Sequence, residues 1–134
     1  MKDPVLHIQL RDWADIAVIA PLSAHTLAKI ATGLCDDTLT CVLRAWDFGY
    51  KNSLKKGKPI VLAPACNTAM WEHPLTQSQL DIVVKFGISN GQSESSLVKI
   101  VNPQVKTLAC GEVGNGALAN TVDIAKAAKD SMSE

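Results

Sequence analysis

One stretch of the sequence combines residue types that could bind a ligand, at a place where ligands are commonly bound. Between Pro64 and Pro74 it carries an amide at Asn67, a thioether at Met70 and an indole at Trp71. It directly follows a short, branched apolar run of the kind that forms a buried parallel strand. Ligands of open α/β sheets bind beyond the carboxyl ends of the strands, so a binding loop is expected here. A strand-to-helix turn whose Asn makes local hydrogen bonds is the alternative.

Two further side chains that could take part in catalysis lie far from this stretch in the sequence. His7 falls in the segment 5–10, whose weak alternation fits either a short helix or a strand edge. Its type and position fit a histidine that only satisfies hydrogen bonds near a segment end. Cys110 lies in the segment 106–119, which also holds three glycines and so allows a tightly turning, lid-like backbone. A surface loop with an incidental thiol is the alternative.

Strands and helices alternate around these residues and predict an α/β doubly wound, Rossmann-like or flavodoxin-like parallel sheet. The apolar runs predict strands over 16–20, 59–63 and 97–101, and the periodic segments predict helices over 25–33, from 36 onward, 75–86 and 121–132. Ser23 suits the N-cap of the first of these helices and Gly33 its end. Leu39 and Trp46 are expected in the core or an interface. Cys35 and Cys41 are expected to act as small buried hydrophobic residues.

Composition limits the function classes that the chain can belong to. The 134 residues suit one domain, and the 47% hydrophobic content suits a globular core. The 13 basic and 13 acidic residues balance, which argues against a nucleic-acid-binding surface. No apolar run is long enough to cross a membrane and no signal peptide is visible, so a cytoplasmic protein is expected. The four cysteines show neither metal-ligand spacing nor a disulfide framework.

Four segments carry a resemblance to a known family. The segment 64–71, PACNTAMW, resembles the PxMNxxMW signature of phosphopantothenoylcysteine decarboxylases, within the family of flavin-dependent cysteine decarboxylases. The segment 3–8 is similar to that family's catalytic-histidine segment, 20–27 to its flavin-contacting PxSANT segment, and 108–114 to its catalytic-cysteine loop. The four occur in the family's order and span nearly the whole chain. Long identities further suggest a eukaryotic, fungal member.

The resemblance implies an activity and a set of site residues. The activity is decarboxylation of 4′-phospho-N-pantothenoylcysteine to 4′-phosphopantetheine in coenzyme A biosynthesis, with FMN as cofactor and no metal. The implied catalytic residues are His7 as an acid/base group, Asn67 as the holder of the substrate carboxylate, and Cys110 as a proton donor on a flap. The implied FMN contacts are Ser23, Ala24, His25, Thr26 and Ala65, and the implied substrate contacts are Asn67, Met70, Thr107, Ala109 and Leu118.

The resemblance also implies partners and an incomplete domain. Family members are trimers with the site at the subunit boundary, so a homotrimer or a heterotrimer with related subunits is expected. The segment 1–134 resembles the C-terminal two-thirds of the family domain, without its first strand and its flavin-phosphate turn. His25 stands where the family has Asn, and Cys66 where Met is usual. The resemblance leaves two alternatives open: a regulatory subunit that inhibits a protein Ser/Thr phosphatase, or a peptidyl-cysteine decarboxylase of the same family.

Overall fold

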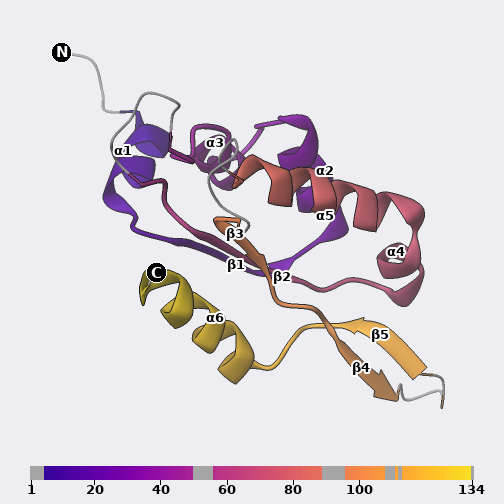
Figure 1. Cartoon of the computed structure of the whole chain (residues 1–134). Coiled ribbons are helices and arrows are strands. Elements are labelled where there is room, and N and C mark those ends of the chain that lie inside the picture. The colour runs from indigo at the N-terminus through magenta and orange to yellow at the C-terminus, as the bar shows by residue number, and fades with distance from the viewer. Residues whose placement is uncertain (1–4, 50–55, 89–95, 108–110, 112, 134) are drawn as a thin grey trace.

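The apolar runs of the sequence form a three-stranded parallel sheet in the order β1-β2-β3 (Figure 1). The structure is a computed structural model, and it describes residues 5–49, 56–88, 96–107, 111 and 113–133. In chain order the elements are α1 (Leu6–Trp13), β1 (Ala17–Leu22), α2 (Ala24–Thr32), α3 (Thr38–Arg44), β2 (Ile60–Pro64), α4 (Thr68–Glu72), α5 (Pro74–Phe86), β3 (Val98–Ile100), β4 (Gln104–Thr107), β5 (Val113–Ala117) and α6 (Thr121–Ser133).

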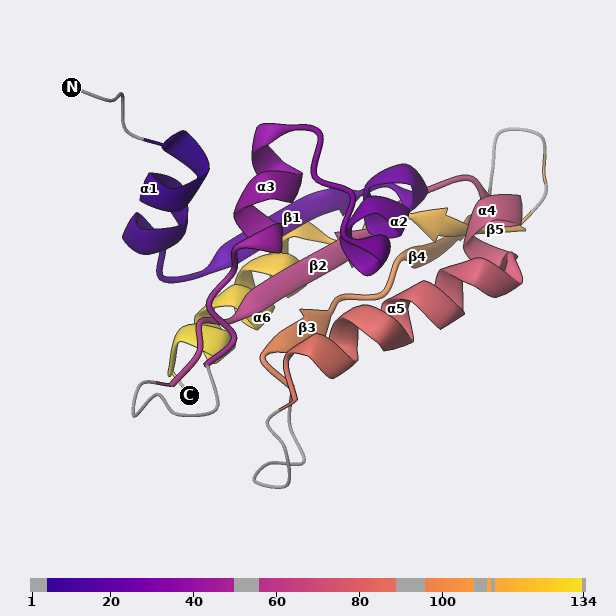
Figure 2. The same ribbon diagram turned by 90° about the horizontal axis from the view of Figure 1, so that it is seen from above.

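The central strand, β2, is buried along its whole length, as an unbroken apolar run predicts. It pairs in parallel with β1, where Val18 lies opposite Val61, and with β3, where Val61 lies opposite Lys99. Helices α2, α3 and α5 cover one face of this sheet, and α6 lies against the other face and contacts β2 (Figures 1 and 2). The predicted α/β fold with a parallel sheet is therefore confirmed.

The main core lies between the sheet and the three helices on its first face. Its buried members are Ile19, Leu22, Leu27, Leu43, Trp46, Ile60, Leu62, Leu80, Val83 and Val98. A smaller cluster beneath α6 joins Ala63, Ala119 and Ile124. Trp46 also donates its indole N–H to the Lys58 carbonyl at 2.9 Å, so its buried polar group has a partner.

Local sequence signals set the ends of α2 and α3. The Ser23 hydroxyl accepts the Thr26 N–H at 3.1 Å, and Gly33 ends α2 with a φ of 81°, which confirms both predicted boundary residues. Asp37 and Thr40 form a reciprocal capping box at the start of α3. Because β1 ends at Leu22 and α2 starts at Ala24, Ser23 lies at the carboxyl end of the sheet.

Polar contacts hold α1, which has no buried residue. Arg11 Nε donates to the Ala45 carbonyl at 2.6 Å. The Lys58 ammonium donates to the carbonyls of Arg11 at 2.8 Å and Asp12 at 3.2 Å, at the end of the helix where the dipole favours a cation. The segment 5–10, which the sequence left open between helix and strand edge, is thus helical over 6–13.

Several sequence predictions are wrong. Parts of the predicted loop at 106–119 form an antiparallel hairpin of β4 and β5, and α4 was not expected at all. Leu39, expected in the core or an interface, is 40% exposed in the single chain and so is not part of the core. Cys35 is exposed because it lies between α2 and α3, outside either helix. Within the described residues no helix is long and apolar enough to cross a membrane.

Candidate active site at the carboxyl edge of the sheet

The carboxyl ends of β1 and β2 bring two of the predicted site segments together. Leu22 pairs with Pro64 across the sheet, and the Ala65 N–H donates to the Leu22 carbonyl at 3.0 Å. Ser23, which follows Leu22, and Asn67, which follows Ala65 by two residues, therefore leave the same edge of the sheet. The sequence-predicted binding loop lies where parallel α/β sheets place their ligands.

The first segment, 23–26, forms the exposed N-terminus of α2. Ser23 and His25 are exposed, whereas Ala24 and Thr26 are half-buried. The Thr26 N–H donates to the Ser23 hydroxyl, and the Leu27 N–H donates to the Ser23 carbonyl. The first N–H groups of a helix have no partner within the helix, so those of Ala24 and His25 can meet a polar ligand edge.

The second segment carries Asn67 as the N-cap of α4. Its Oδ1 accepts the Ala69 N–H at 2.8 Å, and its carbonyl accepts the Trp71 N–H at 2.9 Å. Asn67 is exposed, and the cap occupies only its amide oxygen, so its amide N–H₂ group can still donate. Met70 lies on the same short helix with half of its surface exposed. Its carbonyl accepts the Thr76 hydroxyl, which links α4 to α5.

The hairpin of β4 and β5 packs directly on this loop. The Cys66 N–H donates to the Gly116 carbonyl at 2.9 Å. A Cβ at Gly116 would lie 1.9 Å from the Cys66 carbonyl oxygen, so only glycine allows this approach. Burial raises the pKa of the Cys66 thiol, which therefore stays neutral at the junction.

Side chains also join the hairpin to α4, and none of these contacts was predicted from the sequence. Asn115 Nδ2 donates to Glu72 Oε1 at 2.7 Å, and the Asn115 N–H donates to the Thr68 hydroxyl at 3.4 Å. Asn115 Oδ1 is buried and has no hydrogen-bond partner among the residues that the structure describes. The run Gly-Asn-Gly at 114–116 is the only sequence signal, since a polar residue between two glycines suits a close backbone approach.

The remaining predicted substrate contacts lie on or beside the hairpin. Thr107 ends β4, opposite Val113, and is exposed. Leu118 follows β5, packs on the cluster beneath α6, and accepts the Gln104 side-chain amide through its carbonyl at 2.8 Å. Ala109 and Cys110 lie outside the described residues.

His7 is not brought to this edge within one chain. It is half-buried on α1, and α1 packs on α3. Figure 2 places α1 at one end of the sheet, and α4 and β5 at the other. The Asn67 loop and the hairpin therefore converge, whereas the helix that carries His7 lies at the other end of the sheet.

Among the described residues no three His, Cys, Asp or Glu side chains gather in a way that could hold a metal ion. The polar groups at this edge are backbone N–H groups, hydroxyls and amides. Such groups suit a neutral organic ring or a carboxylate better than a cation.

Comparison with known proteins gives one consistent family. The family model described as Flavoprotein matches residues 1–133. A phosphopantothenoylcysteine decarboxylase of Oryza sativa subsp. japonica is 53% identical over 117 residues, which cover 87% of this chain and 45% of the rice protein. The chain thus spans about half the length of the relatives it matches. These matches give no specific support to a fungal origin, which stays a prediction.

Two solved structures are similar over nearly the whole chain. A mutant PPC decarboxylase in complex with pantothenoylaminoethenethiol superposes with a TM-score of 0.80 at 44% identity, over 98% of this chain and 63% of that one. The FMN binding protein AtHal3 superposes with a TM-score of 0.76, also at 44% identity, over 98% of this chain and 62% of that one.

Proposed function

The chain belongs to the Flavoprotein family, and from that membership we propose that it takes part in decarboxylating 4′-phospho-N-pantothenoylcysteine to 4′-phosphopantetheine in coenzyme A biosynthesis. The observation that carries the proposal is the convergence of the Asn67 loop and the β4–β5 hairpin at the carboxyl edge of the sheet. Asn67 keeps an amide donor exposed there, and Thr107 lies on the strand that leads to Cys110.

The residues at this edge fit FMN. The pyrimidine side of an isoalloxazine ring carries carbonyl and N–H groups, and the N–H groups of Ala24 and His25 can bond such an edge. Ser23, Thr26 and Ala65 are small enough to let a flat ring approach. When bound, the flavin supplies the acceptance and return of two electrons, which makes loss of CO₂ from a cysteine carboxylate possible.

This chain's own residues would bind and orient the substrate. Asn67 would hold the carboxylate through neutral N–H donors, which leave it free to depart as CO₂. Met70 and Leu118 would contact the remainder of the substrate. Cys110 would donate the proton that the carbon needs after decarboxylation, and His7 would act as an acid/base group, the role for which enzymes most often use histidine.

We further propose that the working site lies between subunits of a trimer. Helix α1, which carries His7, and helix α4, whose N-cap is Asn67, lie at opposite ends of the sheet in one chain (Figure 2), so one chain's His7 would have to serve the Asn67 of a neighbour.

A related proposal concerns the sheet. Val18 of the edge strand β1 is 43% exposed, whereas interior parallel strands are buried, and a doubly wound sheet would continue beyond it with another strand. Cytoplasmic location is part of the same proposal.

Mixing two inactive variants tests the shared site. His7→Asn and Asn67→Asp would each abolish CO₂ release, and Asp at position 67 preserves the N-cap of α4 while it repels the substrate carboxylate. Random mixing in a trimer puts an intact His7 and an intact Asn67 at about one quarter of the subunit boundaries, so about one quarter of the activity should return. No recovery on mixing, with trimers formed, would contradict the shared site.

A substrate assay separates this function from its alternatives. The wild-type protein should release CO₂ from phosphopantothenoylcysteine and show a flavin absorption band. Inhibition of a Ser/Thr phosphatase without CO₂ release would favour the regulatory function. Release of CO₂ from peptidyl cysteine only would favour a peptidyl-cysteine decarboxylase.

A further inference from the structure

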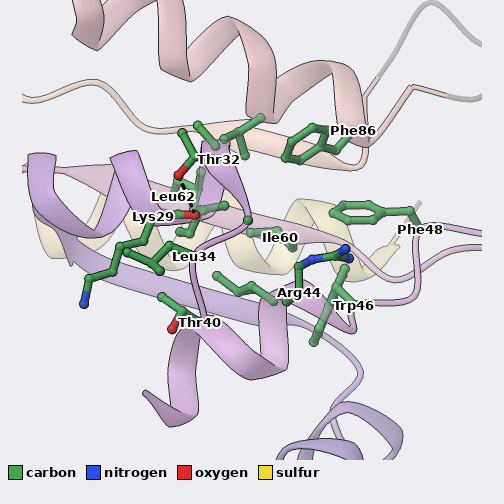
Figure 3. A pocket seen from close by; sticks show the side chains of 15 residues that line it. Lys29, Thr32, Leu34, Thr40, Arg44, Trp46, Phe48, Ile60, Leu62 and Phe86 are labelled. Carbon is green, nitrogen blue, oxygen red and sulfur yellow. Dashed lines mark hydrogen bonds between the residues drawn. The ribbon is translucent and has the colours of Figure 1, made fainter. Parts of the chain in front are cut away.

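A cavity lies on the face of the sheet that α2, α3 and α5 cover, away from the site described above. It has a volume of about 580 Å³ and lies among α2, α3, α5 and the start of β2 (Figure 3). Pockets for small molecules commonly have volumes of about 300–1,000 Å³. None of the predicted flavin, substrate or catalytic residues that the structure describes lines it, and α2 contributes only its C-terminal half, from Lys29 onward.

The cavity wall is apolar and rigid at its base. Ile60 and Leu62 of β2, Leu43 of α3, and Val83 of α5 line it, and all four are buried members of the main core. Trp46 lines it as well, fixed by its indole hydrogen bond to the Lys58 carbonyl. Water in such a place finds few hydrogen-bond partners, so an alkyl or aromatic group would displace it favourably.

Aromatic rings form one end of the cavity. Phe48 and Phe86 come from different parts of the chain and meet edge-on, with ring centroids 6.2 Å apart and an interplanar angle of 61°. Figure 3 shows the Arg44 guanidinium at this end, near Phe48 and Trp46. A ligand at this end would meet aromatic surface and a positive charge together.

The other polar groups of the lining already have partners. Lys29 pairs with Asp36 at 2.9 Å and with Asp37 at 3.4 Å. The Thr32 hydroxyl donates to the Ala28 carbonyl at 2.7 Å, and Thr40 belongs to the capping box of α3. These groups add little to the recognition of a ligand.

Arg44 differs from them. Its guanidinium makes no hydrogen bond or ion pair in the part of the chain that the structure describes, and its side chain passes close to Gly33, where a Cβ would lie 3.6 Å from Nε. A guanidinium presents a planar set of N–H donors that matches a carboxylate or a phosphate. The lining therefore combines an apolar surface, which can contact the body of a ligand, with one guanidinium that can bind an anionic group.

We propose that this cavity binds a small amphipathic anion, with an alkyl or aromatic body against the Ile60–Leu62 wall and a carboxylate or phosphate on Arg44. The proposal is independent of the decarboxylase function, because it uses none of the same residues. The two anion types share the same recognition by Arg44, and the experiment distinguishes them.

The test compares four probes with the same chain length: octanoate, octyl phosphate, octan-1-ol and octylammonium. The ¹⁵N-labelled protein is titrated, and the indole N–H signals of the three tryptophans are followed by NMR. The Trp46 signal should move, while those of Trp13 and Trp71, which do not line the cavity, should not. At least one anion should bind about tenfold more tightly than octan-1-ol, as expected for one charge-assisted contact, and octylammonium should bind most weakly.

Two variants of Arg44 and one matched control make the assignment specific. Arg44→Met should lower anion affinity to that of octan-1-ol without changing octan-1-ol binding, and Arg44→Glu should make octylammonium the preferred probe. Lys126→Met removes an exposed cation from α6 on the other face of the sheet and should change nothing. Equal binding of all four probes, unchanged anion affinity in Arg44→Met, or no shift of the Trp46 signal would overturn the proposal. A preference between octanoate and octyl phosphate identifies the anionic group.

Discussion

Asn115 and Glu72 face each other at 2.7 Å between Nδ2 and Oε1, although 43 positions separate them in the chain. This bond joins the hairpin strand β5 to the short helix α4, which carries Met70 and has Asn67 as its N-cap. Asn115 therefore helps to hold the hairpin against the helix beside the proposed substrate site.

Removing that contact should loosen the hairpin. Asn115→Ala should lower the free energy of unfolding by about 1 kcal/mol, the typical net value of one hydrogen bond. Asn115→Asp should cost more, because it places a second carboxylate against Glu72. Chemical denaturation measures both, and the matched control is Gln77→Ala, since Gln77 bonds Asp81 on the exposed surface of α5 and touches no hairpin. Equal costs for the two Asn115 variants would contradict the charge argument.

The approach of β5 to the Asn67 loop should tolerate no side chain at position 116. Gly116→Ala places a Cβ 1.9 Å from the Cys66 carbonyl oxygen, so backbone must move, at a cost of about 3 kcal/mol. Gly111→Ala is the comparison: its Cβ meets no atom within 4 Å, and only its φ of 87° makes the change unfavourable, by about 1 kcal/mol. Thermal unfolding of both variants checks the order, and a larger loss in Gly111→Ala would contradict it.

The capping box of α3 should make stability depend on acid pH. The N–H and hydroxyl of Thr40 hold the pKa of Asp37 below its ordinary value of 3.8. A carboxyl with a lowered folded-state pKa adds stability above its unfolded pKa and loses it as the pH falls through the folded pKa. Wild type should therefore exceed Asp37→Asn in melting temperature at pH 6, and the difference should shrink below about pH 4, near the ordinary value for a carboxyl. A difference that stays constant down to pH 2 would show that the charge contributes nothing.

The contact between Lys58 and the end of α1 should control the order of that helix. Lys58→Met removes the donor to the Arg11 and Asp12 carbonyls, and no buried residue of α1 compensates for it. Amide hydrogen exchange should become faster in α1, with β2 unchanged. Lys106→Met, on the exposed strand β4, is a matched control that should leave α1 unaffected. Unchanged exchange rates in α1 would mean that the hydrogen bond from Arg11 to the Ala45 carbonyl is enough to keep the helix ordered.

The regular elements could be predicted because their signals are local. Unbroken apolar runs identified the three parallel strands, and Ser23 and Gly33 marked the ends of α2. The segment 5–10 stayed ambiguous because α1 buries nothing, so its periodicity is weak. Helix α4 was missed because five residues between Asn67 and His73 are too few to show a helical period.

The hairpin and the cavity among α2, α3 and α5 depend on contacts between distant segments. The sequence Val-Gly-Asn-Gly-Ala has low strand propensity, and only its pairing with β4 and its contact with Cys66 make it a strand. The cavity arises from the spacing of α2, α3 and α5 over the sheet. The edge location of Asn67 was predictable from the strand before it, whereas its bond to Ala69 required the structure.

The polar attachment of α1 has a consequence for how mutations could remove the proposed activity. A helix fastened by one ammonium and one guanidinium can come loose through changes at Lys58 or Arg11 while the sheet stays folded. Such variants would keep their expression level and their melting curve. If the proposed shared site is correct, they would still lose CO₂ release, because the helix that carries His7 would no longer be held in place for the neighbouring subunit.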